Sequence, residues 1–361
     1  MIDHIWLAHF PKITYARHKK ISAHLLNTRS FEEIEMLDLC DIGIEPEIAH
    51  ELIVWRENNP WEKINNNLIQ HKITALTIDD PRYPFLLKQI TDPPFVLFVR
   101  GHLQNSQIEM AIGVVGTRHY TLYGKDICIK LSAAMAQRKI TIVSGLALGI
   151  DSFAHEATLK EKGITIAVLG GGIDRATIHP RSHENLAERI IEGGGAILSE
   201  YPPGAEPTKF SFPARNRIIA GLTQGTLVIE APLQSGALIT AKRALDYNRE
   251  VLAVPHPINS SNGAGGNELI KKGATLVTSV DDISEALNWQ VIIPPKTDGK
   301  EINCNTEEKQ ILLILQNEPL PLEEIIQKTG FSSDKILVNL TLLEMRGLIK
   351  NLGGGYYSKN T

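Results

Sequence analysis

The feature that most constrains the fold of this chain is an alternation between residues 71 and 290. Short apolar runs rich in β-branched residues alternate there with longer helical stretches. Near-continuous apolar runs are typical of strands buried on both faces, and intervening helices indicate a parallel sheet covered on both sides. The expected strands are 111–115, 140–143, 164–169, 196–199, 226–229, 250–254 and 274–277. The pattern predicts an α/β fold with a Rossmann-like, mostly parallel sheet at its core.

The segments on either side of this core have different patterns. Residues 1–70 repeat apolar positions at helical spacing and predict an N-terminal helical domain. Residues 291–306 are polar and contain Pro294 and Pro295, which predicts a linker. Residues 307–361 predict three helices, 307–315, 322–329 and 333–345, followed by a hairpin at the glycine run 353–355. That order is typical of a winged-helix domain.

Net charge limits how such a chain can bind nucleic acid. The formal charge is -4, so binding must come from a local basic cluster rather than from overall positive charge. Cys40, Cys128 and Cys304 are widely separated, which argues against a disulfide framework, a zinc ribbon or a thioredoxin-type site. We therefore expect no metal and no cofactor.

The start of the chain predicts where the protein resides. Residues 1–4 do not begin a signal peptide, and no apolar run approaches the length needed to span a bilayer. We expect a cytoplasmic protein without a membrane contact.

Glycine-rich turns follow several of the expected strands. Ligands on open parallel sheets bind at the carboxyl ends of the strands, where glycine lets backbone N–H groups approach a phosphate. One such turn is explained by the need to reverse the chain, but several on the same edge favour an anion-binding site. The residues assigned to it are Gly116, Thr117, Arg118, Gly145, Ser235 and Gly236.

A second candidate feature is the segment 209–217. Cations bind phosphate, and aromatic faces beside cations are typical of sites for unstacked bases. The alternative is a solvated basic turn whose phenylalanines lie in the core, with the arginines held in ion pairs. The candidate DNA-binding residues here are Lys209, Phe210, Phe212, Arg215, Asn216 and Arg217.

Enzyme motifs are weak in this sequence. Gly113 and Gly116 have the wrong spacing for a dinucleotide fingerprint, and no Walker phosphate loop is present. Asp151, Asp174 and Glu230 stand at strand ends, where acids serve hydrolysis or else order the glycine loops by accepting N–H bonds. We favour the ordering role and assign no catalytic residue.

Residues 78–280 resemble the DNA-processing protein A family, also called DprA or Smf. The resemblance rests on motifs that occur in the family's order: Tyr83-Pro84, Asp92-Pro93-Pro94, Val115-Gly116-Thr117-Arg118, Ser144 to Asp151, Gly170-Gly171-Gly172-Ile173-Asp174, Ser199-Glu200-Tyr201-Pro202, Phe212 to Leu222, Glu230-Ala231, Ser235-Gly236 and Asn267-Glu268-Leu269-Ile270.

The resemblance implies a non-catalytic protein that binds and protects single-stranded DNA. It implies a homodimer, with Leu269 and Ile270 in the dimer region, and a role in loading the RecA recombinase during natural transformation and recombination. It also places Arg118, Lys209 and the segment 215–217 in the DNA pocket. The first 70 residues and the tail resemble the family's variable leading domain and its winged helix.

Four positions depart from the family pattern. His256 stands where glycine is usual, Gly266 where cysteine is common, and His179 where tyrosine usually precedes Pro180. A Pro-Gly-x-Gly hairpin is replaced by a sequence that starts at Phe10. We therefore assign no DNA contact to the N-terminal domain.

Two other functions remain as alternatives. Residues 221–226 and Glu230 partly echo a motif of Rossmann-like enzymes that cleave nucleoside monophosphates, but the paired glycines before the threonine are missing. A winged helix that reads duplex DNA is the other alternative. Its expected recognition helix, 333–345, carries only Lys335 as a cation, with Arg346 just beyond it, so affinity should be weak. Leu337, Leu340, Leu342 and Leu343 are expected to form the core of the tail.

Overall fold

A computed structural model of the chain describes residues 2–25, 30–289, 305–316 and 318–359. The chain forms two compact units, which lie within Met1–Ile292 and Ile293–Thr361. Most of the expected linker, 291–306, and Cys304 lie outside the described residues.

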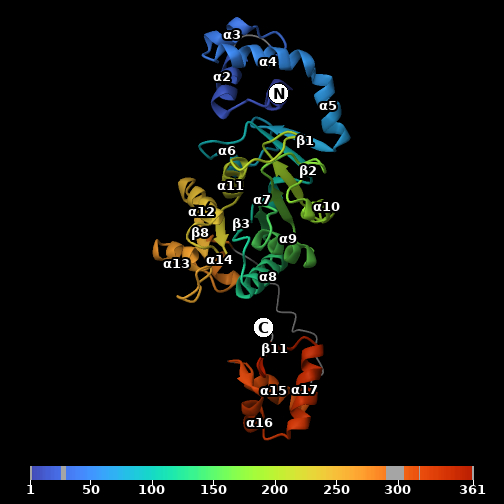
Figure 1. Cartoon of the computed structure of the whole chain (residues 1–361), viewed down its shortest axis with the longest axis vertical. Helices are drawn as coiled ribbons and strands as arrows, with labels where there is room; N and C mark the ends of the chain where they lie inside the picture. The colour runs from blue at the N-terminus through green and yellow to red at the C-terminus, as the bar shows by residue number, and fades with distance from the viewer. Residues whose placement is uncertain (1, 26–29, 290–304, 317, 360–361) are drawn as a thin grey trace. The chain divides into compact units, whose positions relative to one another are not determined.

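The first unit begins with short helices, as the apolar spacing of residues 1–70 predicts. They are α1 (Ile2–Ala8), α2 (Tyr15–Leu25), α3 (Met36–Asp41), α4 (Pro46–Asn58) and α5 (Trp61–Gln70). Figure 1 shows α2–α5 grouped beside β1 and β2. Leu7, Phe31 and Leu52 belong to the same buried cluster as Phe98 and Ile197 of the sheet. The helices therefore share a core with the sheet, and the boundary between 70 and 71 remains a proposal.

One mixed sheet forms the centre of this unit. Its nine strands lie in the order β1-β2-β6-β5-β4-β3-β7-β8-β9. They are β1 (Ile73–Thr77), β2 (Val96–Gly101), β3 (Ala111–Val115), β4 (Thr141–Ser144), β5 (Thr165–Val168), β6 (Ala196–Ser199), β7 (Gly225–Val228), β8 (Glu250–Ala253) and β9 (Thr275–Leu276). The seven expected strands are all present, with ends that shift by at most one residue.

The parallel part of the sheet runs from β6 to β9, and β1 and β2 pair antiparallel at one end. The Rossmann-like prediction of a mostly parallel sheet is therefore confirmed. Strands β1 and β2 are additional to the seven strands expected from the apolar runs.

Helices cover both faces of the sheet. They are α6 (Phe85–Lys88), α7 (Asn105–Ile108), α8 (Leu122–Gln137), α9 (Ile150–Lys160), α10 (Glu184–Glu192), α11 (Ser211–Leu222), α12 (Gly236–Asp246), α13 (Ala264–Lys271) and α14 (Val280–Ala286), with a short 3₁₀ turn, η1, at Arg181–His183. One layer contains α8, α9 and α10, and the other contains α6, α11 and α12. Strand β3 lies between β4 and β7, so the chain reverses its winding direction there. Open α/β sheets bind ligands at the carboxyl ends of the strands beside such a reversal.

The second unit has the element order of a winged helix. It contains α15 (Thr306–Ile314), β10 (Leu320–Pro321), α16 (Leu322–Thr329), α17 (Ser333–Met345), β11 (Ile349–Gly353) and β12 (Tyr356–Lys359). Leu340 and Leu343 are buried in its core, as expected. The same expectation was wrong for Leu337 and Leu342, which are 43% and 37% exposed. The reason is that α17 is apolar around most of its circumference, while only one of its sides packs on α15 and α16.

Candidate nucleic-acid interface

The loop after β3 contains Gly116, Thr117 and Arg118. The N–H of Thr117 donates to the carbonyl of Glu230 at 2.7 Å, which joins this loop to the end of β7. A side chain at Gly116 would lie 2.6 Å from Ile150, so only glycine lets α9 begin this close to the loop. Arg118 is exposed. The loop thus holds a cation in solvent at the point where the sheet reverses its winding.

The loop after β4 is held from within by a buried acid. Asp151 Oδ2 accepts the N–H of Gly145 at 3.1 Å. Leu146 and Gly149 have positive φ values of 58° and 84°, so the chain turns sharply before α9. Burial raises the pKa of Asp151, and Arg215 and the backbone N–H groups of the loop oppose that rise.

Arg215 of α11 forms the floor of the site. Its side chain is buried, and Nη1 donates to the carbonyls of Gly145, at 2.7 Å, and of Val168. Burial lowers its pKa to about 10, so the guanidinium stays charged at neutral pH. The nearby Asp151 carboxylate favours the charged form of the guanidinium and so opposes this effect of burial.

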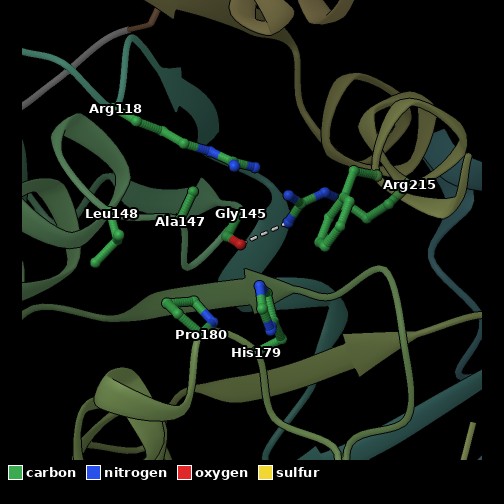
Figure 2. A pocket seen from close by; sticks show the side chains of 8 residues that line it. Arg118, Gly145, Ala147, Leu148, His179, Pro180 and Arg215 are labelled. Carbon is green, nitrogen blue, oxygen red and sulfur yellow. Dashed lines mark hydrogen bonds between the residues drawn. The ribbon is translucent and has the colours of Figure 1, made fainter. Parts of the chain in front are cut away.

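These loops enclose one pocket. It is lined by Arg118, Gly145, Ala147, Leu148, His179, Pro180, Phe212 and Arg215. Figure 2 shows the guanidinium groups of Arg118 and Arg215 pointing toward each other, with the His179 ring beside them. The guanidinium of Arg118 lies 5.7 Å from the centre of the Phe212 ring, a cation–π distance. The pocket therefore combines two cations with aromatic and apolar walls.

An exposed basic and aromatic corner precedes α11. The Phe210 ring is 73% exposed, and Lys209 Nζ lies 5.0 Å from its centre. A phenylalanine this exposed forms no part of the core, so the alternative that placed it there is wrong for Phe210. Both side chains are accessible to a ligand.

Asn216, Ser235 and Gly236 lie together but do not line the pocket. Asn216 Nδ2 donates to the carbonyl of Gly236 at 3.3 Å. The Ser235 hydroxyl accepts the N–H of Ala237 and so caps α12. These groups connect α11 to the start of α12, and their role as DNA contacts remains a proposal.

Arg217 differs from the other candidate cations. Its side chain is only 11% exposed and forms an ion pair with Glu200, and Nε lies 3.7 Å from Asp92 Oδ2. Asp92 also accepts the hydroxyl of Tyr247 at 2.6 Å. Arg217 is thus held in a buried ion-pair network, and we propose that it has a structural role rather than the DNA contact expected from the sequence.

The strand-end acids order the loops, as the sequence favours. Asp174 Oδ1 accepts the N–H of Gly204 at 2.7 Å and the hydroxyl of Thr177. Glu230 is fully buried, and its two oxygens accept the N–H and the hydroxyl of Thr121. Asp151 binds Gly145 in the same manner, as described above. These carboxylates are therefore occupied within the fold.

Comparison with known proteins places this geometry in a family. Residues 74–288 match the family model of DNA recombination-mediator protein A, and residues 295–355 match the DprA winged helix domain. The chain belongs to the DNA recombination-mediator protein A family. Protein Smf of Escherichia coli is 40% identical over 286 residues, which are 77% of this chain and 75% of that protein. DNA processing protein DprA of Bacillus subtilis is 43% identical over 215 residues, 60% of this chain and 71% of that protein.

Two solved structures of family members resemble this fold. DNA processing protein A from Streptococcus pneumoniae has a TM-score of 0.66 at 35% identity, covering 79% of this chain and 97% of that one. The protein from Helicobacter pylori, described as having a unique single-stranded DNA binding mode, has a TM-score of 0.53 at 30% identity. It covers 61% of this chain and 97% of that chain.

Sequence reasoning missed part of the pocket lining in this family member. It singled out His179 and Pro180 only as a departure from the family pattern, and it did not assign Ala147 and Leu148 to the site. The sequence did contain a signal for these four residues. Ala147 and Leu148 follow the glycine at 145, and His179 and Pro180 follow the glycines at 170–172, and both glycine loops come after neighbouring parallel strands. Such loops converge on one edge of the sheet.

Neither a metal-binding cluster nor a membrane-spanning helix occurs in the described part of the chain. It contains no group of three or more His, Cys, Asp or Glu side chains placed to hold a metal ion. None of its helices is long and apolar enough to cross a membrane.

Proposed function

We propose that this family member binds single-stranded DNA at the pocket and at the exposed corner formed by Lys209 and Phe210. The main observation in support is that Arg118, Arg215 and Phe212 line one cavity at the carboxyl edge of the sheet. Guanidinium groups bind phosphates, and aromatic faces stack with bases that are not already stacked in a duplex. The single-stranded DNA binding described for the Helicobacter pylori relative supports this proposal.

The proposal extends to how the protein acts. We infer a homodimer that protects incoming strands and helps load the RecA recombinase in natural transformation, as the family resemblance implies. Leu269 and Ile270 of α13 are partly buried against the core and remain the proposed dimer contacts. A Leu269→Arg variant that is still dimeric in gel filtration would place the interface elsewhere.

We propose that the protein carries out this role without catalysis. The residue required by the nucleotide-cleaving alternative is Glu230, and its carboxylate is fully buried and bonded to Thr121. Incubation with AMP tests the alternative, and release of adenine and ribose phosphate would support it over the DNA-binding proposal.

A fluorescence-anisotropy titration tests the proposed function. A labelled oligo-dT and a duplex of equal length are titrated at the same salt concentration, because phosphate contacts make every affinity salt-dependent. We expect the single strand to bind at least tenfold more tightly than the duplex. Equal affinities would point to general electrostatic attraction and against a pocket for unstacked bases.

A further inference from the structure

His179 is the histidine among the residues that line the pocket. It lies between β5 and η1, next to Pro180, and its side chain is exposed. Its ring centre lies 5.7 Å from that of Phe212, with 48° between the ring planes. Figure 2 shows the ring directed toward the guanidinium of Arg215 and the backbone of Gly145. The imidazole is therefore at the opening through which a ligand would meet both arginines.

The other charged groups at the pocket come from four segments. Arg118 comes from the loop after β3, and Arg215 from α11. Asp151 of α9 is buried behind Gly145 and bonded to its N–H, and His183 of η1 has Nδ1 2.8 Å from the carbonyl of Leu146. Arginine stays protonated throughout the neutral range. Among the eight residues that line the pocket, only His179 has a side chain of the type that changes charge between about pH 5 and 8.

We propose that His179 is a DNA-contacting residue whose imidazolium form binds a phosphate of the strand, so that affinity for single-stranded DNA rises as the pH falls. This inference rests on the proposed function. The neutral ring still lies beside Phe212 and supports a base, so the contact weakens at higher pH without being lost. His179 thereby makes the strength of binding depend on pH, which arginine in its place would not do.

The direction of the effect follows from linkage. A phosphate next to the ring favours the charged form of the imidazole, because opposite charges attract. Binding of DNA then takes up a proton, and a reaction that takes up a proton is weakened as the pH rises. Arg118 and Arg215 contribute no pH dependence because they remain charged. Asp151 and His183 are present in every variant used below, so their contributions cancel in the comparison.

The test measures binding of a labelled oligo-dT by anisotropy at about pH 5.5 and about pH 8, at one ionic strength. Thymine has no group that titrates in this interval, so the probe itself does not change. His179→Tyr keeps a flat ring for stacking but cannot become a cation. His50→Tyr makes the same replacement at an exposed histidine of α4, outside the pocket lining, and serves as the matched control.

We expect the wild type and His50→Tyr to bind about tenfold more tightly at the lower pH, the effect of one contact worth about 1.4 kcal/mol. His179→Tyr should bind with nearly the same affinity at both pH values, close to that of the wild type at high pH. Its log–log salt slope at low pH should be smaller by about 0.7, because one phosphate contact is lost. Thermal unfolding at both pH values verifies folding, and His179→Gln replaces the tyrosine variant if that variant does not fold.

Two results would overturn the inference. One is a wild type whose affinity does not change with pH, and the other is a His179→Tyr variant that keeps the full pH dependence. Both leave the proposed function intact, because single-stranded DNA is still bound. A wild type that fails to bind oligo-dT at either pH would instead overturn the proposed function.

Discussion

At the residue scale, burial gives three arginines of this site different roles. Arg118 is exposed, Arg215 is buried against carbonyl groups and Asp151, and Arg217 is paired with Glu200. The sequence located the cation cluster but could not distinguish these roles. The reason is physical: the acids that neutralise the arginines come from segments distant in the sequence, and only the fold brings them together.

This difference predicts opposite outcomes for two alanine variants. Arg118→Ala should weaken binding of single-stranded DNA and flatten the log–log salt slope by about 0.7, with an unchanged melting temperature. Arg217→Ala leaves Glu200 buried without a partner and should reduce the free energy of unfolding by about 3–5 kcal/mol. Anisotropy and thermal unfolding of both variants check this.

The control for these variants is Arg189→Ala. Arg189 pairs with Glu156 at the surface, where both side chains are about half exposed. Its loss should cost less than about 1 kcal/mol. If Arg217→Ala were as stable as Arg189→Ala, the structural role assigned to Arg217 would be wrong.

At the element scale, strands were predicted well because their signal is local. A run such as 111–115 is apolar throughout and bounded by turn residues, and β3 has those bounds. The backbone conformation of the loops was not predictable in the same way. Leu146 has a positive φ, which leucine adopts rarely, and the contacts of the folded loop impose it.

The loop after β4 leads to a prediction for Gly145→Ala. The new methyl group would lie 2.6 Å from Asp151 Oδ2 and equally close to the Arg215 guanidinium, both of which are buried. We expect a lower melting temperature and at least a tenfold loss of affinity for single-stranded DNA. Gly236→Ala is the stability control, because no heavy atom lies within 4 Å of the added methyl group. A Gly145→Ala variant with wild-type stability and affinity would contradict the proposed loop geometry.

The N-terminal helices lead to a pH prediction. The His18 ring stacks on Phe95 with 4.0 Å between ring centres, and burial lowers its pKa to about 3. Burial also lowers the pKa values of His4 and His9. The His18 ring is therefore neutral in the folded protein, so its stabilisation is complete above the unfolded histidine pKa of about 6.5 and is lost as the pH falls below it.

Thermal unfolding at about pH 7.5 and about pH 5 measures this effect. We expect the melting temperature of the wild type to fall at the lower pH. His18→Gln, which cannot gain a charge there, should show a smaller fall, whereas His50→Tyr should match the wild type. The burial assigned to His18 would be wrong if the glutamine variant and the wild type lost stability equally.

At the scale of the whole molecule, the order of helices and strands was predictable because it follows from local patterns. Which apolar side chains are buried and which are exposed was less predictable, as the exposure of Leu337 and Leu342 on α17 shows. The two cations at the presumed recognition helix, whose small number already predicted weak DNA binding, are engaged within the tail. Lys335 pairs with Glu307, and Arg346 with Glu308. The presumed recognition helix α17 thus has its few cations already paired within the tail.

Truncation tests this division of roles. A chain that ends near residue 295 should keep its affinity for single-stranded DNA within tenfold, about 1.4 kcal/mol, and should remain dimeric. It should lose at most a modest contribution to duplex binding or a contact with a partner protein. A larger loss in the anisotropy titration would mean that the tail shares the principal DNA site.

The most direct test of the central claim is to locate the bound strand on the protein. An oligonucleotide of 5-iododeoxyuridine is cross-linked to the wild-type chain by ultraviolet light, and the modified peptides are identified by mass spectrometry. We expect the cross-links at Phe212 and Phe210, the aromatic residues of the pocket and of the corner beside it. They should disappear when Arg118→Ala is used at the same DNA concentration. Cross-links confined to helices α1–α5 or to the tail would contradict the claim that single-stranded DNA binds at the carboxyl edge of the sheet.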